Sequence, residues 1–145
     1  MPVSASNKQI SFFFPDTRPT LKNRAGLKRF ILSIFKKEKK NAGAINYVFC
    51  TDRALLDINR RYLKHNFYTD IITFDLSEGT AVQADIYISI DRVRENAQKI
   101  GVTLKEETHR VIFHGVLHLC GYKDKSAKDA KIMREKEEFY LSKYF

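Results

Sequence analysis

The segment from His114 to Asp124 has the sequence HGVLHLCGYKD, in which two histidines stand four residues apart. Side chains at this spacing project from the same side of a helix, so both imidazoles can bind one metal ion. Gly121 accepts the left-handed conformation that ends many helices, which lets the chain turn back and bring Asp124 toward the histidines. The segment therefore predicts a metal-binding helix with His114, His118 and Asp124 as ligands. Three protein ligands leave a position for water, as catalytic zinc sites do.

A histidine in a helix is more often an ordinary core or surface residue than a metal ligand, and that alternative applies to this pair. The surrounding residues are nearly all apolar, which predicts a buried helix. Burying an unpaired polar group costs about 1 to 3 kcal/mol, and one metal ion would satisfy both imidazoles. The spacing, the glycine and the predicted burial together favour ligands. His109 stands five positions before His114, and His65 lies in a basic turn, so neither is assigned to the metal.

Gly115 distinguishes this helix from the metal-binding helix of a zinc peptidase. Such a peptidase has its glutamate base directly after the first histidine, and a glycine cannot accept a proton. Peptide hydrolysis by that mechanism is therefore disfavoured, and activation of water would depend more on the metal ion itself.

The length and charge of the chain limit its class. It has 145 residues, with 26 Lys and Arg against 17 Asp and Glu, and a formal net charge of +9. This length fits one domain, residues 1–145, and no repeat or linker divides the sequence. The positive charge favours a nucleic-acid partner, although a basic protein without such a partner is an equal alternative.

The cysteines and the N-terminus bear on location. Cys50 and Cys120 lie far apart in apolar contexts, so we expect reduced thiols rather than a disulfide or a four-cysteine zinc site. Residues Met1 to Ser6 lack the regions of a signal peptide, and the phenylalanines at 12–14 are stopped by Pro15. We therefore expect a soluble, cytoplasmic protein with no membrane segment.

Hydrophobic periodicity predicts an order of strands and helices. Strands are expected at residues 10–14, 46–50, 70–76 and 82–90. Helices are expected around residues 27–35, 52–62, 91–101 and 103–120, and from residue 126 toward the C-terminus. A turn at residues 77–80 makes an antiparallel hairpin of the last two strands. This order predicts an α+β domain, in which a mixed four-stranded sheet is packed with helices and the metal-binding helix lies near the C-terminal third.

Three finer expectations concern helix ends and faces. Asp91 is expected to cap the helix that ends at Gly101, and the lysines at 36, 37, 39 and 40 are expected at a solvated helix end. The second helix is expected to bury the stripe Ala54, Leu55, Ile58 and Tyr62.

The metal-binding segment resembles the YbeY family of metal-dependent endoribonucleases, which act in bacterial rRNA maturation and ribosome quality control. The family pattern is His-Gly-x-Leu-His-Leu-x-Gly-Tyr-Asp-His. This chain matches it at His114, Gly115, Leu117, His118, Leu119, Gly121 and Tyr122. Asp124 stands where the family usually has a third histidine, and a carboxylate oxygen is also a zinc ligand.

Two further blocks resemble the family and occur in the same order. Ile58-Asn59 with Tyr62, followed by YTDIITF at 68–74, is similar to the family's Leu-Asn and Thr-Asp-Val-Leu-Ser-Phe block. DIYIS at 85–89 is similar to its Gly-Asp-Ile strand, with Ala84 in place of the glycine. The resemblance thus covers the chain from about residue 55 onward.

The resemblance also identifies a departure near the site. The family's arginine after the aromatic residue of the second helix aligns with Leu63. Arg60, Arg61 or Lys64 would then bind substrate phosphate instead, although each is equally expected as an ordinary exposed cation.

The resemblance implies a zincin-like α+β domain that binds one divalent metal ion, with zinc expected. It implies a single-strand-specific endoribonuclease that matures the 3′ end of 16S rRNA and serves ribosome quality control, with rRNA and the ribosome as partners. His114, His118 and Asp124 would then act through water on the ion. Met133 is expected either beneath the metal or, as methionine at helical spacing usually is, in the ordinary core.

No general base is evident from the sequence. Asp70 and Asp85 lie near strand ends and are candidates, although Asp70 could equally brace the loop before its strand. Two alternative functions stay open. One is a metal-dependent hydrolase of another substrate, and the other is a ribosome-binding factor whose metal is structural.

Overall fold

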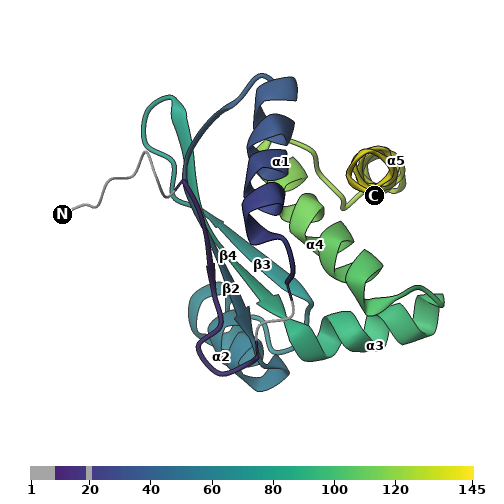
Figure 1. Ribbon diagram of the computed structural model, residues 1–145. Helices are drawn as coiled ribbons and strands as arrows, with labels where there is room; N and C mark the ends of the chain where they lie inside the picture. The colour runs from purple at the N-terminus through teal and green to yellow at the C-terminus, as the bar shows by residue number, and fades with distance from the viewer. Residues whose placement is uncertain (1–8, 19–20) are drawn as a thin grey trace.

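A mixed four-stranded sheet forms the centre of the fold in residues 9–18 and 21–145, which the computed structural model describes (Figure 1). The strands are β1 (Ile10–Phe13), β2 (Asn41–Cys50), β3 (Ile71–Asp75) and β4 (Ala81–Ser89), in the order β1-β2-β4-β3. Strands β1, β2 and β4 are parallel, whereas β3 is antiparallel to β4. The predicted α+β class, mixed sheet and hairpin are therefore confirmed. The segment Met1 to Ser6, for which we expect no signal peptide, lies outside the described residues.

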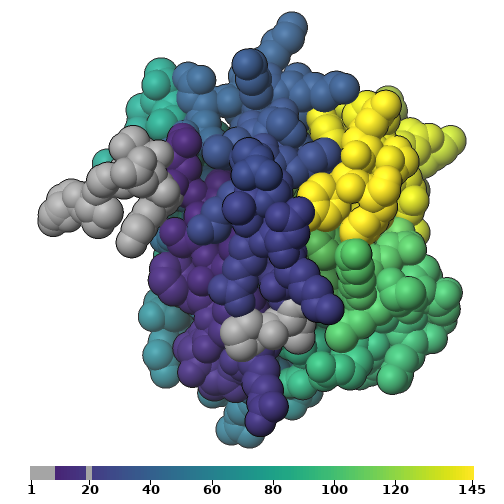
Figure 2. Space-filling view, in the orientation of Figure 1, coloured from purple at the N-terminus to yellow at the C-terminus, as the bar shows by residue number. Residues whose placement is uncertain are grey.

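Helices cover both faces of the sheet. They are α1 (Arg24–Lys37), α2 (Asp52–Leu63), α3 (Ile90–Ile100), α4 (Leu104–Leu119) and α5 (Ala127–Tyr144). Helices α1 and α4 lie on the same side of the sheet, with α5 beyond α4 (Figure 1). On the face of the molecule that Figure 2 shows, α1 lies between β1 and α5.

The main core lies between the sheet and helices α1 and α4. Strand β2 contributes Ile45, Tyr47 and Phe49, all fully buried, because alternate residues of a strand point to the same face. The Tyr47 hydroxyl donates a hydrogen bond of 3.0 Å to the carbonyl oxygen of Ile112 in α4. This bond ties the predicted metal-binding helix to the centre of the sheet. The predicted apolar face of β4 is also confirmed, since residues 82, 84, 86 and 88 are buried.

Helix α2 packs on the opposite face of the sheet. Ile71 belongs to the periphery of the main core, whereas its neighbour Ile72 packs with Cys50 and Leu55 in a small separate cluster. Consecutive strand residues point to opposite faces, which places α2 across the sheet from α4.

The predicted buried stripe of α2 is partly wrong. Leu55 is buried and Ala54 and Ile58 pack around it, but Tyr62 is 62% exposed. Asn59 is buried instead, and its side-chain amide donates to the backbone of the following loop, which an apolar residue could not do.

Two predicted boundaries are also wrong. Strand β2 begins at Asn41 rather than Asn46 and pairs with β4 through a register shift after Ala42, which the weak strand preference of alanine and glycine concealed. Asp91 does not cap α3. The Ser89 hydroxyl does so, accepting from the Arg92 amide at 3.1 Å. The lysines at 36, 37, 39 and 40 are exposed at the end of α1, as predicted. Among the described helices, none has the length and apolar character needed to cross a membrane.

Candidate metal centre

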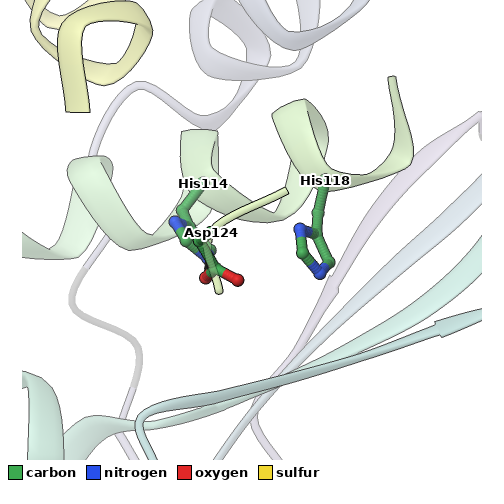
Figure 3. Close-up of side chains that lie close together, drawn as sticks. All are labelled: His114, His118 and Asp124. Carbon is green, nitrogen blue, oxygen red and sulfur yellow. Dashed lines mark ion pairs between the residues drawn. The ribbon is translucent and has the colours of Figure 1, made fainter. Parts of the chain in front are cut away.

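Helix α4 brings the two predicted histidine ligands to one side. It begins at the N-cap Thr103, whose hydroxyl accepts a hydrogen bond of 3.0 Å from the Glu106 amide. His114 and His118 project from adjacent turns of this helix, and their rings lie nearly parallel with centroids 5.7 Å apart (Figure 3). The predicted shared face is therefore confirmed.

The turn after α4 returns the third predicted ligand to this face. Gly121 has φ 105°, and the Tyr122 amide donates to the Leu117 carbonyl oxygen at 3.0 Å, so the chain reverses at the glycine as predicted. The Asp124 side chain then lies over the helix, with its Oδ2 atom 3.2 Å from Nε2 of His114 (Figure 3). Ligand atoms of His114, His118 and Asp124 all lie within 4.8 Å of one another.

A carboxylate at the end of α1 holds this turn in place. The Tyr122 hydroxyl donates to Oε1 of Glu38 at 2.8 Å, and Tyr140 and Lys136 of α5 bond to its other oxygen. Burial opposes the ionisation of Glu38, but the hydrogen bonds from Tyr140 and Tyr122 and the charge of Lys136 outweigh it and lower the pKa of this carboxyl. Glu38 was not among the residues predicted from the sequence.

Glu137 of α5 orients the first histidine. Its Oε2 atom accepts a hydrogen bond of 2.6 Å from Nδ1 of His114, which leaves Nε2 on the side of Asp124 and available to a metal ion. Glu137 is only 5% exposed. Glu137 was not predicted from the sequence. Its place on the buried stripe of Met133, Tyr140 and Leu141 could have indicated it, because a buried charge needs a partner.

Charges around Glu137 set the local electrostatics. Arg110 contacts Glu137 at 3.5 Å, Glu107 at 3.3 Å and Glu138 at 2.6 Å, so it neutralises part of this acidic group. Burial by itself lowers the pKa of His114, but the hydrogen bond and charge of Glu137, with smaller contributions from neighbouring carboxylates, raise it above its ordinary value. Because a metal ion needs the neutral ring, binding of the ion would displace a proton.

The site opens onto a cleft of about 630 Å³, so the predicted burial of both histidines is wrong for His118. His114 is half-buried, but His118 and Asp124 are exposed. The helix is buried as predicted, yet the face with the ligands is not, because it lines the cleft. Burial therefore gives no support to a metal at His118, and the shared geometry of the three side chains does.

Of the two candidate bases, only Asp70 lies at the cleft. Asp70 lines it, and its Oδ2 atom accepts from the Asn96 amide at 3.2 Å. Burial raises the pKa of Asp70, although the nearby charge of His114 counteracts this. Asp85 bonds to Asn46 at 3.1 Å and faces away from α4, on the side of the sheet that α2 partly covers, so it is no candidate base.

The predicted phosphate-binding cations lie beside the cleft rather than in it. Within the described part of the chain, Leu63 lines the cleft, but Arg60, Arg61 and Lys64 do not. Arg60 lies 4.0 Å from the carboxylate of Asp57. All three cations are exposed at the end of α2.

The other predicted residues are also located. Met133 is buried in the main core and lines the cleft, so both expectations for it describe part of its position. His109 is buried away from the ligands, bonds to the Lys105 carbonyl at 2.7 Å and stacks on Tyr144. His65 lies in the loop after α2, as expected.

Gly115 allows α4 to approach the sheet closely. A Cβ atom at this position would lie 3.1 Å from Ile86 and 3.2 Å from Ile71, closer than ordinary packing permits. A glutamate here would extend into the core instead of into the cleft. The glutamate base of a peptidase would therefore require Ile86 and Ile71 to shift.

These residues fit a divalent metal ion. Two imidazoles and one carboxylate are a common ligand set for zinc, the first imidazole has its second nitrogen fixed by Glu137, and the open cleft gives access to substrate.

Comparison with known proteins agrees with the geometry. The model of a family described as Endoribonuclease YbeY matches residues 16–145. The chain belongs to the YbeY family. The predicted resemblance is therefore confirmed, and with it the zincin-like α+β fold.

Individual relatives of the YbeY family match most of the chain. An Endoribonuclease YbeY of Cytophaga hutchinsonii is 51% identical over 134 residues, which are 92% of this chain and 94% of the relative. Another from Flavobacterium psychrophilum is 53% identical over 109 residues, which are 75% of this chain and 78% of the relative. The solution structure of TM1509 from Thermotoga maritima has a TM-score of 0.62 and 27% identity, and covers 93% of this chain and 88% of that one.

Proposed function

We propose that this protein is a metal-dependent endoribonuclease that cleaves single-stranded RNA during rRNA maturation. The observation that supports this most directly is the cluster of His114, His118 and Asp124 at an open cleft, in a chain of the YbeY family. The finer parts of the proposal are that it acts at the 3′ end of 16S rRNA, in ribosome quality control and in the cytoplasm, with zinc as the ion. The net charge of +9 supports a polyanionic substrate.

The proposed mechanism assigns a task to each residue of the cleft. His114, His118 and Asp124 hold the ion, and Glu137 keeps the proton of His114 on Nδ1. A divalent ion at such a site polarises a phosphoryl oxygen and makes water a stronger nucleophile. Asp70 is the proposed proton acceptor, since its carboxylate lines the cleft and its raised pKa suits proton transfer nearer to neutral pH. The cations Arg60, Arg61 and Lys64 are proposed to contact flanking phosphates.

The metal assignment is tested with His114→Ala, His118→Ala and Asp124→Asn. We expect each variant to lose bound metal and to lose cleavage of a single-stranded RNA, while the control Asp85→Asn on the other side of the sheet keeps both. Elemental analysis of the purified proteins measures the metal and identifies it. Removal of the ion with a chelator should abolish cleavage, and added zinc should restore it. Unchanged metal content in both histidine variants would contradict the site.

The ribosome-binding alternative requires a separate test, because it predicts the same metal content. His118→Ala is expressed in cells that lack the protein, and rRNA processing is measured. We expect no rescue, since the proposed role of His118 is in cleavage. Full rescue by folded His118→Ala protein would favour a docking role over catalysis.

A further inference from the structure

Two exposed aromatic rings line the cleft on the loop between α2 and β3. The rings of His65 and Phe67 are stacked, with centroids 5.0 Å apart and an angle of 20° between their planes. Both residues line the cleft that contains the metal ligands, and Phe67 is 55% exposed. Single exposed aromatic residues are common on protein surfaces. A stacked pair within a candidate active site is different, because it offers an aromatic face to the substrate.

The loop that carries these rings is held by the end of α2. The buried side chain of Asn59 donates to the Phe67 carbonyl oxygen at 2.8 Å, and the His65 amide donates to the Asn59 carbonyl oxygen at 3.1 Å. Between the two rings, Asn66 accepts a hydrogen bond of 2.5 Å from Arg60. The backbone on both sides of the stacked pair is thus fixed before any substrate binds, which lowers the entropy lost on binding.

The charge around the pair suits a nucleic acid. Arg61 and Lys64 are exposed within four residues of His65, and the whole chain is strongly basic. Cations that attract a phosphate backbone, placed beside rings on which bases stack, are the combination found in proteins that bind single strands.

We propose that His65 and Phe67 form a stacking site for an unpaired nucleobase of the substrate, and that this site favours single-stranded over duplex RNA. The proposal rests on the proposed function and specifies how that cleft would recognise its substrate. Bases within a duplex are already stacked on both faces, so only an unpaired base can be received by the rings. Stacking depends little on base identity, so weak sequence preference is expected at this position.

Tryptophan fluorescence gives a direct test, because the chain contains no tryptophan. The variant F67W places a single reporter in the stacking site. The control F13W places one at a phenylalanine of similar exposure, 50%, in β1, which is at the other edge of the sheet from β3. Titration is done with a chelator present, so that RNA is bound but not cut. We expect single-stranded RNA to quench the emission of F67W and not of F13W, and an RNA duplex to quench neither.

A binding measurement separates this proposal from the proposed function. Phe67→Leu keeps an apolar side chain but removes the aromatic face, and we expect it to weaken single-strand binding about 5- to 150-fold in fluorescence anisotropy, whereas Phe13→Leu changes nothing. If single-stranded RNA binds F67W without quenching, and Phe67→Leu binds as the unmodified protein does, the stacking site is refuted and the nuclease stands. If the unmodified protein neither binds nor cleaves RNA, both proposals fail.

Discussion

The hydrogen bond between His114 and Glu137 makes a quantitative prediction about metal affinity. At 2.6 Å, with the carboxylate buried, this is a charge-assisted hydrogen bond, which contributes about 1.5 to 3 kcal/mol. That range corresponds to about 10- to 150-fold in a binding constant, and loss of such outer partners usually weakens metal binding about 10- to 100-fold.

Two substitutions of Glu137 should differ in size. Glu137→Gln keeps an oxygen that can accept from Nδ1 of His114 and removes only the charge, so we expect affinity for zinc to fall about tenfold. Glu137→Ala leaves the ring without its partner, and we expect a fall of about 100-fold. Glu138→Gln is the matched control, because Glu138 also contacts Arg110 but has no contact with His114.

Competition with a chelator of known affinity measures zinc binding, and circular dichroism confirms that each variant is folded. The expected order of affinity is unmodified protein and Glu138→Gln, then Glu137→Gln, then Glu137→Ala. Equal affinity of Glu137→Ala and the unmodified protein, in an assay where His114→Ala binds no zinc, would refute the argument that Glu137 orients the ligand.

Three other substitutions test the electrostatics and packing. The pKa of Glu38 in the folded protein lies below its ordinary value, so its ionised form stabilises the fold near neutral pH, and this contribution is lost as the pH falls through the lowered pKa. Glu38→Gln should therefore lower the free energy of unfolding by about 1 kcal/mol at pH 7, measured in urea, and the difference should shrink toward pH 3. The effect at Asp70 has the opposite sign: burial raises the pKa of Asp70, so its ionised form opposes folding at pH 7. Asp70→Asn should therefore increase the free energy of unfolding of the metal-free protein at pH 7, measured in urea, while RNA cleavage falls. Gly115→Val should lower the free energy of unfolding by about 1 to 3 kcal/mol, because even a Cβ atom meets Ile86 at 3.1 Å; equal urea midpoints for this variant and the unmodified protein would contradict the packing argument.

The elements that the sequence predicted well are those with strong local patterns. Helix α4 has Thr103 as its N-cap, and β4 alternates buried and more accessible residues over nearly its whole length, so each could be located from its own residues. The start of β2 could not, because residues 41–44 have little strand preference, and the pairing of Asn41 and Ala42 with β4 depends on residues about 40 positions away in the sequence. The burial of Asn59 could not be predicted from helical periodicity either, because it depends on a hydrogen bond to Phe67 in the loop after α2.

The same distinction holds at the candidate metal centre, where features set by local sequence were predicted and contacts between distant residues were not. The spacing of His114 and His118 and the turn at Gly121 are local, and they sufficed to predict that these two histidines and Asp124 lie together. The contacts that position these side chains are distant in sequence: Glu137 lies 23 residues from His114, and Glu38 lies 84 residues from Tyr122, to which it is hydrogen-bonded. Tyr122 is two residues before Asp124, the proposed third ligand, so the bonds from Glu38 to Tyr122 and to Lys136 and Tyr140 of α5 help to position the turn that carries this carboxylate. Substitutions at Glu38 should therefore weaken metal binding, although Glu38 is not itself a proposed ligand. The ligand motif alone gives no indication of this contribution.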